Sequence, residues 1–527
     1  MTKLNFKGEI MKQIKQLRGR LYGFLQSRQT RMCLIATAIF GTLSYLYLFV
    51  NNINNNDMIA CLPEGCGTGI ASGRWGLCIL GGLAKRIWGV YNVPVFNGLI
   101  ALIFLAFTSA VLVRVFELRN EWLCFSLAAI TATFAPIGAM MLFQFTVHFY
   151  SVAIALMAVA AYLLKKRHWA AFLGASLLAA GSLGIYQAFF PFLAAVLLLT
   201  LLGNCLKRET TGKEILFDAL RALAALVLSY LIYTLILKLF LVVLHTSLDS
   251  YQGIDRMGSL EDLPHNLVTV FLSFFRLPFA IVCGTNYTLF VRIAILLLLV
   301  FSAGSLLLFW RERKVGKLLL AGAFLLLLPA AANSIMLLSG NSTIYTRMCY
   351  GLIAVFYLPL LLSQQLSFRK PAWKKAAGII ASLLVLLSST NYAWQNNGNY
   401  QAVYYANRKT ENYFSTMFTR IRSLDGYRDD MRIVLVGQTI TDEKYYDNYY
   451  GTPFNYGART SASEQINQYS RLDFLANYFG ISIHNADEDE VLQYAEELAG
   501  MPGYPDSGCM QIIDDTVFVV LEPPLTD

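Results

Sequence analysis

The sequence predicts a polytopic α-helical membrane protein that carries a small α/β domain at its C-terminal end. Of the 527 residues, 56% are hydrophobic and only 14% are charged, whereas soluble globular chains carry about 25% charged residues. The mean hydropathy is +0.51. The apolar residues also form long blocks, and a helix that crosses a bilayer needs about 20 of them in succession. These observations exclude a chain that is soluble throughout, a disordered chain and a small disulfide scaffold.

Eleven apolar segments are long enough to cross a bilayer. They are residues 32–50, 94–116, 122–142, 147–164, 169–186, 188–206, 219–245, 288–310, 318–338, 347–366 and 376–393. A basic stretch, residues 1–31, precedes the first of them. A cleavable signal peptide has a shorter apolar region that begins earlier and ends at small residues. The first segment is therefore expected to remain as a membrane span.

The positive charges predict the orientation of the spans. Lys and Arg concentrate in alternate short loops, namely 117–121, 165–168, 207–217, 311–317 and 367–375. Short loops rich in Lys and Arg stay in the cytoplasm. The N-terminus is then cytoplasmic, and the long loops 51–93 and 246–287 are external together with the tail. The net charge of +9 is explained by this topology, so no nucleic-acid partner is expected.

The chain is expected to have three parts: the basic segment 1–31, a membrane domain over 32–393, and a soluble extracytoplasmic α/β domain over 394–527. The third part has ordinary soluble composition. Its apolar patterns predict helices at 402–423, 463–480 and 488–500 and buried strands at 431–437 and 516–521. This pattern favours a small α/β domain on the external face.

Two cysteines in the first external loop form a candidate disulfide. Cys61 and Cys66 flank the sequence Leu-Pro-Glu-Gly, and a disulfide closing so short a loop is compatible with an oxidising compartment. The alternative is two free thiols. No histidine lies nearby, so the spacing does not favour a zinc site, and no metal site is predicted.

Asp57 is the acidic residue that follows the first span most closely. A carboxylate held near the bilayer surface can serve as a general base. The alternative is a solvated loop residue or a helix cap, both of which are common roles for aspartate.

A short helix is expected at 73–91 in the same loop. It opens Gly73-Arg74-Trp75 and combines apolar residues with Lys85 and Arg86, a composition typical of a helix that lies in the membrane interface. Such a helix suits a lipid-linked substrate, because it offers an apolar face to the chain and cations to a phosphate. A plain membrane anchor would show the same pattern.

Further polar residues lie at the external ends of the spans. Arg276 and Arg347 stand at the ends of apolar segments, where arginine either clamps a phosphate or reaches the lipid head groups. Tyr186 and Gln187 lie between two spans. They either line a cavity or hydrogen-bond between helices.

Four short motifs, in this order and in these topological positions, resemble the bacterial type-II O-antigen glucosyltransferase family. They are Asp57 after the first span, Gly73-Arg74-Trp75, the segment Gly184-Ile185-Tyr186-Gln187-Ala188-Phe189, and Tyr251-Gln252-Gly253-Ile254 in the second large loop. The resemblance covers residues 30–390, roughly, and does not extend to the tail.

The resemblance implies a polytopic GT-C membrane glycosyltransferase of the bacterial cell (inner) membrane. Such an enzyme moves a sugar, here expected to be glucose, from a polyprenyl-phosphate donor to a hydroxyl of a cell-surface glycan. By the resemblance, Asp57 is the base, and Arg74 and Arg347 neutralise the phosphate, with Arg276 as the next candidate. Trp75 is expected to bind the substrate too, and Tyr186 and Gln187 to line the sugar cavity. Some relatives have a second acid beside the base, where this chain has Met58. A divalent cation is therefore not supported, and no cofactor is expected.

Three other functions compete with this one. A lipid-linked glycan transporter or flippase would explain the spans, but it predicts ionisable residues at mid-membrane depth and repeated halves, whereas most charges here lie at span ends. A glycan polymerase or ligase would use a similar donor. A scaffold protein whose tail binds a surface polymer would explain the many tyrosines of the tail.

Overall fold

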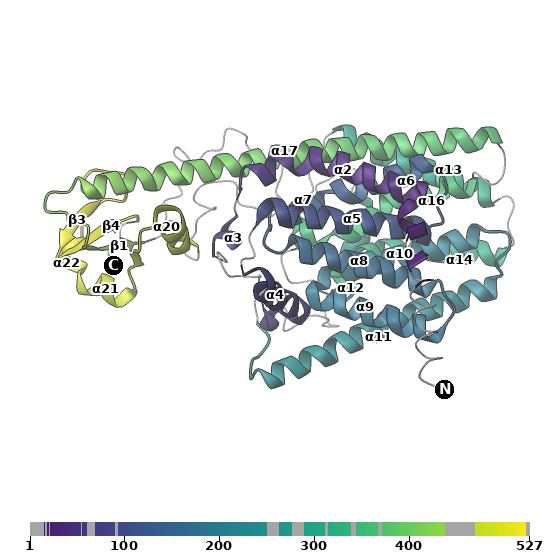
Figure 1. The fold of residues 1–527 in the computed structure, drawn as a ribbon, viewed down its shortest axis with the longest axis horizontal. Coiled ribbons are helices and arrows are strands. Elements are labelled where there is room, and N and C mark those ends of the chain that lie inside the picture. The colour runs from purple at the N-terminus through teal and green to yellow at the C-terminus, as the bar shows by residue number, and fades with distance from the viewer. Residues whose placement is uncertain are drawn as a thin grey trace.

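The computed structural model consists of a bundle of long helices and a small α/β unit, which one very long helix joins (Figure 1). It describes residues 22–53, 55–60, 69–89, 93–249, 263–276, 289–310, 315–338, 344–366, 371–437 and 470–522, together with Lys15, Arg18 and Gly19.

The bundle is built from long and short helices. The long ones are α2 (Arg28–Val50), α5 (Pro94–Val115), α6 (Glu121–Thr133), α8 (Val147–Leu164), α9 (Trp169–Ile185), α10 (Phe190–Leu206), α11 (Gly212–Val243), α12 (Leu263–Arg276), α13 (Leu289–Trp310), α14 (Val315–Ala332), α16 (Ala354–Leu366) and α17 (Pro371–Arg422). The short ones are α3 (Asn56–Ala60), α4 (Trp75–Trp88), α7 (Ala135–Met141), α15 (Ser334–Leu338) and the 3-10 helices η1 (Ile70–Ser72), η2 (Gln187–Phe189), η4 (Thr346–Met348) and η5 (Tyr350–Ile353).

Every predicted span coincides with an apolar helix. Among the described residues, eight helices are long and apolar enough to cross a membrane, or nine if α6 and α7, which meet at a bend of 46°, form one span. The other two predicted spans, 169–186 and 347–366, correspond to the shorter apolar helices Trp169–Ile185 and Tyr350–Gln365. The chain is thus a mostly helical polytopic membrane protein, and the count of eleven spans stays a prediction.

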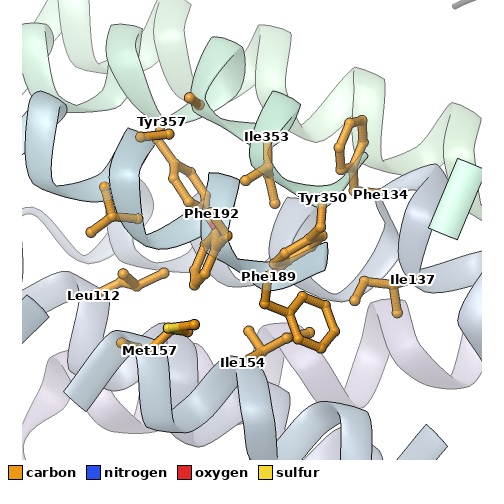
Figure 2. Packing of buried hydrophobic residues seen from close by; sticks show 14 of the residues in the cluster. Leu112, Phe134, Ile137, Ile154, Met157, Phe189, Phe192, Tyr350, Ile353 and Tyr357 are labelled. Carbon is orange, nitrogen blue, oxygen red and sulfur yellow. The ribbon is translucent and has the colours of Figure 1, made fainter. Parts of the chain in front are cut away.

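Aromatic side chains fill the centre of the bundle. Figure 2 shows Phe189 and Phe192 facing Tyr350 and Tyr357, and the rings of Phe192 and Tyr350 lie 4.9 Å apart. The hydroxyl of Tyr357 is 2.8 Å from that of Thr131. These two buried hydroxyls thus satisfy each other, as an apolar interior favours. This packing fixes η2 and η5, the two elements that flank the candidate site.

Charged side chains gather at one end of the bundle. The Glu117 carboxylate accepts hydrogen bonds of 2.8 Å from both Lys165 and Lys207, and Lys317 donates to the Lys207 carbonyl at 2.8 Å. The four predicted cytoplasmic segments around residues 117, 165, 207 and 317 therefore lie at the same end of the bundle. This is what the predicted topology requires, because alternate loops must lie on the same side of the membrane. The α/β unit lies beyond the opposite end (Figure 1).

Replacing Glu117 is expected to lower stability in a pH-dependent way. Burial raises the pKa of Glu117, but the hydrogen bonds from Lys165 and Lys207 outweigh it and leave the pKa below its usual value. The ionised carboxylate therefore stabilises the fold above the unfolded pKa of about 4.3, and this stability is lost as the pH falls through the folded pKa. Glu117→Gln should lower the Tm by about 2 °C at pH 7, and the difference should be clearly smaller at about pH 3, as the pH approaches the folded pKa.

Thermal unfolding in detergent at both pH values checks this. Glu121→Gln is the control, because Glu121 makes one contact of 3.4 Å to Arg28, whose side chain is 79% exposed. An equal loss for Glu117→Gln at both pH values would show that packing, and not charge, is responsible.

The α/β unit contains a four-stranded sheet of order β2-β1-β4-β3. The strands are β1 (Arg432–Val436), β2 (His484–Asn485), β3 (Met510–Ile513) and β4 (Thr516–Val520), and the helices are α20 (Arg471–Phe479), α21 (Glu488–Gln493) and α22 (Ala495–Leu498). β1 is parallel to β2 and β4, whereas β3 and β4 are antiparallel. Asp514 and Asp515, both with positive φ, form the turn between β3 and β4.

The predicted strands 431–437 and 516–521 are confirmed as β1 and β4, whereas β2 and β3 were not predicted. β2 is only two residues long, so it has no alternating pattern to detect. The predicted helix 488–500 begins as expected, because Asp487 caps it by accepting from the Glu490 amide at 2.8 Å. It is divided at Tyr494 into α21 and α22. The predicted helix 463–480 is described only from residue 470, where it forms α20.

The predicted boundary at 393–394 falls inside a single helix. α17 runs unbroken for 52 residues, about 78 Å at 1.5 Å per residue. It thus joins the predicted span 376–393 and the predicted helix 402–423. Its first part lies along the bundle, where the Asn396 amide donates to the Thr133 carbonyl at 3.1 Å. Its last part enters the core of the α/β unit through Phe414 and Phe418.

Candidate active site

Two arginines flank a buried tyrosine at the end of the bundle that faces the α/β unit. Tyr186 lies where α9 ends and η2 begins, and it is 3% exposed. The guanidinium carbon of Arg74 lies 5.0 Å from the centre of its ring, and the positive charge of Arg347 lies near its hydroxyl. The ring stacks on Tyr150 at 4.7 Å, and the Tyr150 hydroxyl accepts from Arg74 Nη1 at 3.3 Å.

Neither guanidinium is neutralised by a carboxylate within the described part of the chain. Arg347 lies over aromatic rings, with its guanidinium carbon 4.3 Å from the Tyr345 centroid and 4.6 Å from that of Phe143. Arg74 Nε is buried and lacks an acceptor. Two cations without a counter-ion, close to one tyrosine, are costly in a partly buried position. The arrangement is suited to an anionic group such as a phosphate.

The turn before Arg74 is held by side chains from two other helices. Gln187 Nε2 donates to the Ser72 carbonyl at 2.9 Å and to the Tyr233 hydroxyl at 3.0 Å. The Tyr233 hydroxyl in turn donates to the Gly73 carbonyl at 3.1 Å. Gln187 therefore holds the backbone that presents Arg74, and its expected place in a sugar cavity stays a prediction.

Substitution of Gly73 should damage the site. Gly73 has φ +73°, and a Cβ atom there would lie 2.6 Å from Gln187 Nε2 and from the Tyr233 hydroxyl. Gly73→Ala must therefore move the turn that carries Arg74. We expect transfer activity to fall by at least about tenfold, because small misplacements of a binding group are costly.

The activity of the purified variant checks this prediction against Gly82→Ala. A Cβ atom at Gly82 on α4 meets nothing within 4 Å, and alanine favours a helix, so this control should be fully active. Normal activity of Gly73→Ala would mean that the turn does not position Arg74.

Trp75 packs into the protein and is 8% exposed. Its ring lies against Gly184, where a Cβ atom would be only 2.4 Å from it, and it stacks on Phe240 at 6.3 Å. Trp75 therefore packs α4 against α9. Its buried indole N–H has no acceptor among the residues that the structure describes.

The predicted helix 73–91 is observed as α4, which begins one residue after Arg74. Its buried face carries Trp75, Leu77 and small residues. Its other face exposes Ile79, Leu83 and Ile87, which are each at least half exposed. An apolar exposed face is what a helix in the membrane interface requires.

Asp57 lies in the first turn of α3 and is half-buried. The helix is capped by Asn55, whose Oδ1 accepts from the Met58 amide at 2.8 Å. Asp57 is therefore not the cap, which removes one alternative to a catalytic role. In the described residues its carboxylate has no hydrogen-bond or ion-pair partner.

The turn between α7 and α8 connects the Asp57 segment to the arginines. Gln144 Nε2 donates to the Ile53 carbonyl at 3.2 Å, just before α3. The adjacent residue, Phe143, contacts Arg347. The structure thus groups Arg74 and Arg347 around Tyr186. The turn that contacts Arg347 is also hydrogen-bonded to the backbone that precedes the helix of Asp57. Sequence reasoning missed Tyr150 and Tyr233, whose only signal was a polar ring in an apolar span.

Arg276, another predicted site residue, does not join this cluster. Arg276 is exposed at the end of α12 and has no hydrogen bond to the cluster among the residues described. Cys61, Cys66 and the motif 251–254 lie outside the described residues. Where the structure describes the chain, no three His, Cys, Asp or Glu side chains form a group that could hold a metal ion.

Comparison with known families identifies the chain. A family model described as "Glucosyl transferase GtrII" matches residues 46–358, which is more than half of the sequence. The match includes Asp57, Arg74, Tyr186 and Arg347, and it ends before α17. Comparisons with curated proteins and with solved structures found no match. The resemblance seen in the sequence is thereby confirmed, and the chain belongs to the GtrII family of glucosyl transferases.

Proposed function

We propose that this membrane glycosyltransferase takes glucose from a polyprenyl-phosphate donor and transfers it to a hydroxyl of a cell-surface glycan. The observation that carries the proposal is the pair Arg74 and Arg347 around Tyr186. The pair has no carboxylate partner in the described residues and lies beside α4, whose apolar face is exposed. A lipid phosphate satisfies both features, because its phosphate meets the cations and its chain meets the apolar face.

The proposed reaction is a direct displacement. Asp57 removes the proton from the acceptor hydroxyl as that oxygen attacks the anomeric carbon of the sugar. The bond from the anomeric carbon to the phosphate oxygen breaks, and the electron pair leaves with the polyprenyl phosphate. Arg74 and Arg347 stabilise the negative charge that the phosphate gains. A single displacement inverts the configuration of the anomeric carbon.

The proposed topology places this site on the external face of the bacterial cell membrane. The loops rich in Lys and Arg meet at the other end of the bundle, at Glu117, Lys165 and Lys207, and such loops stay in the cytoplasm. The N-terminus would then be cytoplasmic and the α/β unit extracytoplasmic.

Donor preference tests the proposal directly. The protein, purified and placed in lipid nanodiscs, is given the surface glycan together with either polyprenyl-phosphate [14C]glucose or a nucleotide [14C]glucose. We expect label to reach the glycan from the lipid donor only, with inversion of the anomeric configuration. Transfer from the nucleotide sugar would contradict the proposal. A parallel assay uses the protein in sealed lipid vesicles. Movement of the labelled lipid from one leaflet to the other, without transfer of the sugar, would indicate a flippase.

A further inference from the structure

We propose that the C-terminal α/β unit is a positioning element of the active site, which it completes by holding the helix of Asp57 through Ile59. The inference rests on the proposed function, because it assumes that Asp57 is the base. It concerns a part of the chain, β1 to β4 with its helices, that lies beyond the segment 46–358 matched by the family.

Adjacent residues of α3 belong to two different hydrophobic cores. Met58 is 1% exposed and packs in the core of the helical bundle. Ile59 is also 1% exposed, but it packs in the core of the α/β unit, together with Phe414 and Phe474. Figure 1 shows α3 between the bundle and α20, and the two helices α3 and α20 are in contact.

This arrangement fixes the direction of the Asp57 side chain. Successive residues of a helix point about 100° apart, so Asp57, Met58 and Ile59 face three directions. Met58 faces the bundle and Ile59 faces the α/β unit, while Asp57 remains half-buried and belongs to neither core. A helix of five residues is not stable alone. Its conformation therefore depends on both cores.

The α/β unit is connected to the bundle by one continuous helix. α17 is continuous, so no loop separates its bundle part from Phe414 and Phe418 in the core of the unit. Arg420 on α17 donates to the Pro505 carbonyl at 2.6 Å. Arg471 at the start of α20 is fully buried and donates to the Asn485 side chain at 3.0 Å. The position of the surface that contacts Ile59 is therefore determined by α17 and by the contacts within the α/β unit.

Ile59→Ala tests the proposal. We expect kcat to fall by about 10- to 100-fold while the KM for the lipid donor stays nearly constant, because the phosphate site is intact and the base is misplaced. Ile59→Val keeps most of the buried contact and should lose much less. Should the alanine variant not fold, a smaller loss of kcat in Ile59→Val, in the same direction, supports the proposal, and an unchanged kcat contradicts it.

Leu498→Ala is the matched control. Leu498 is fully buried in the same α/β unit, but in the core on the other face of the sheet, away from α3. It should leave kcat nearly unchanged. Equal losses in Leu498→Ala and Ile59→Ala would show a general loss of stability and would overturn the proposal.

A double mutant separates a shared contact from two independent effects. Leu475 on α20 lies in the same core as Ile59. If the two residues act through one contact, the combined loss of kcat in Ile59→Ala with Leu475→Ala is smaller than the product of the single losses. Asp57→Asn distinguishes a failure of the positioning role from a failure of the proposed base. If it is inactive while Ile59→Ala is normal, the base stands and the positioning role fails; if Asp57→Asn is active, the proposed base itself fails.

Discussion

Asp57→Asn should reduce kcat by about 10³-fold, because a general base contributes between about 10² and 10⁴ to the rate. The amide keeps the size of the side chain but cannot accept the proton of the acceptor hydroxyl. The KM for the lipid donor should change little, since Arg74 and Arg347 are untouched. Steady-state kinetics of the purified variant give both constants.

The control for this prediction is Asp249→Asn. Asp249 is an exposed acid at the same end of the protein, where its backbone amide donates to the Ala71 carbonyl at 2.9 Å. This variant should retain normal kcat. The reverse outcome, an inactive Asp249 variant beside an active Asp57 variant, would move the base from the first external loop to the second.

Arg347→Ala should raise the KM for the lipid donor by about 10- to 100-fold, since a hydrogen bond to a charged group is worth about 1.5–3 kcal/mol. The guanidinium lies over Tyr345 and Phe143, and its charge is near Tyr186. Lysine restores the charge but neither the planar stacking nor the paired donors. Arg347→Lys should therefore recover only part of the affinity.

Donor titrations check this prediction against Arg408→Ala. Arg408 lies on α17, is 58% exposed and pairs with Glu411, so its loss should have little effect. A normal donor KM in Arg347→Ala would make Arg347 a lipid-facing anchor instead of a phosphate ligand.

The membrane bundle could be predicted because its helices obey a strong constraint. A span must satisfy its backbone hydrogen bonds internally and cover them with apolar side chains, so its length and composition are visible in the sequence. All eleven predicted segments are indeed helical. Two of them, 169–186 and 347–366, are shorter than a typical span. Each stops at a polar residue that packs inside the protein, which is Tyr186 in the first segment and Arg347 in the second.

The continuity of α17 could not be predicted. Residues 395–399, with three asparagines and a glycine, are typical of a loop. In the structure the Asn396 and Asn397 amides donate to the Thr133 and Leu43 carbonyls of neighbouring helices, at 3.1 and 2.6 Å. Asn397 Nδ2 also donates to the Ala393 carbonyl one turn earlier in α17, at 2.8 Å. These side-chain bonds to carbonyl groups leave the helix continuous, whereas such residues usually interrupt a helix by competing for its backbone.

The candidate site was only partly predictable for a related reason. Arg74, Tyr186 and Arg347 stood out singly, because each is polar at the end of an apolar segment. Their contact depends on how distant helices pack, and one sequence does not contain that information. Ile59 gave no signal at all, since an isoleucine after Asp57 and Met58 is expected to face the bundle. Its place in the core of the α/β unit follows only from the fold.

The most direct test of the account is the composition and linkage of the surface glycan of the host in three strains. One strain is intact, one lacks the gene, and one lacks the gene but carries Asp57→Asn at normal levels in the membrane. We expect deletion to remove one side-chain glucose and the Asn variant not to restore it. Full restoration by the Asn variant would contradict the account, because Asp57 could then not be the base.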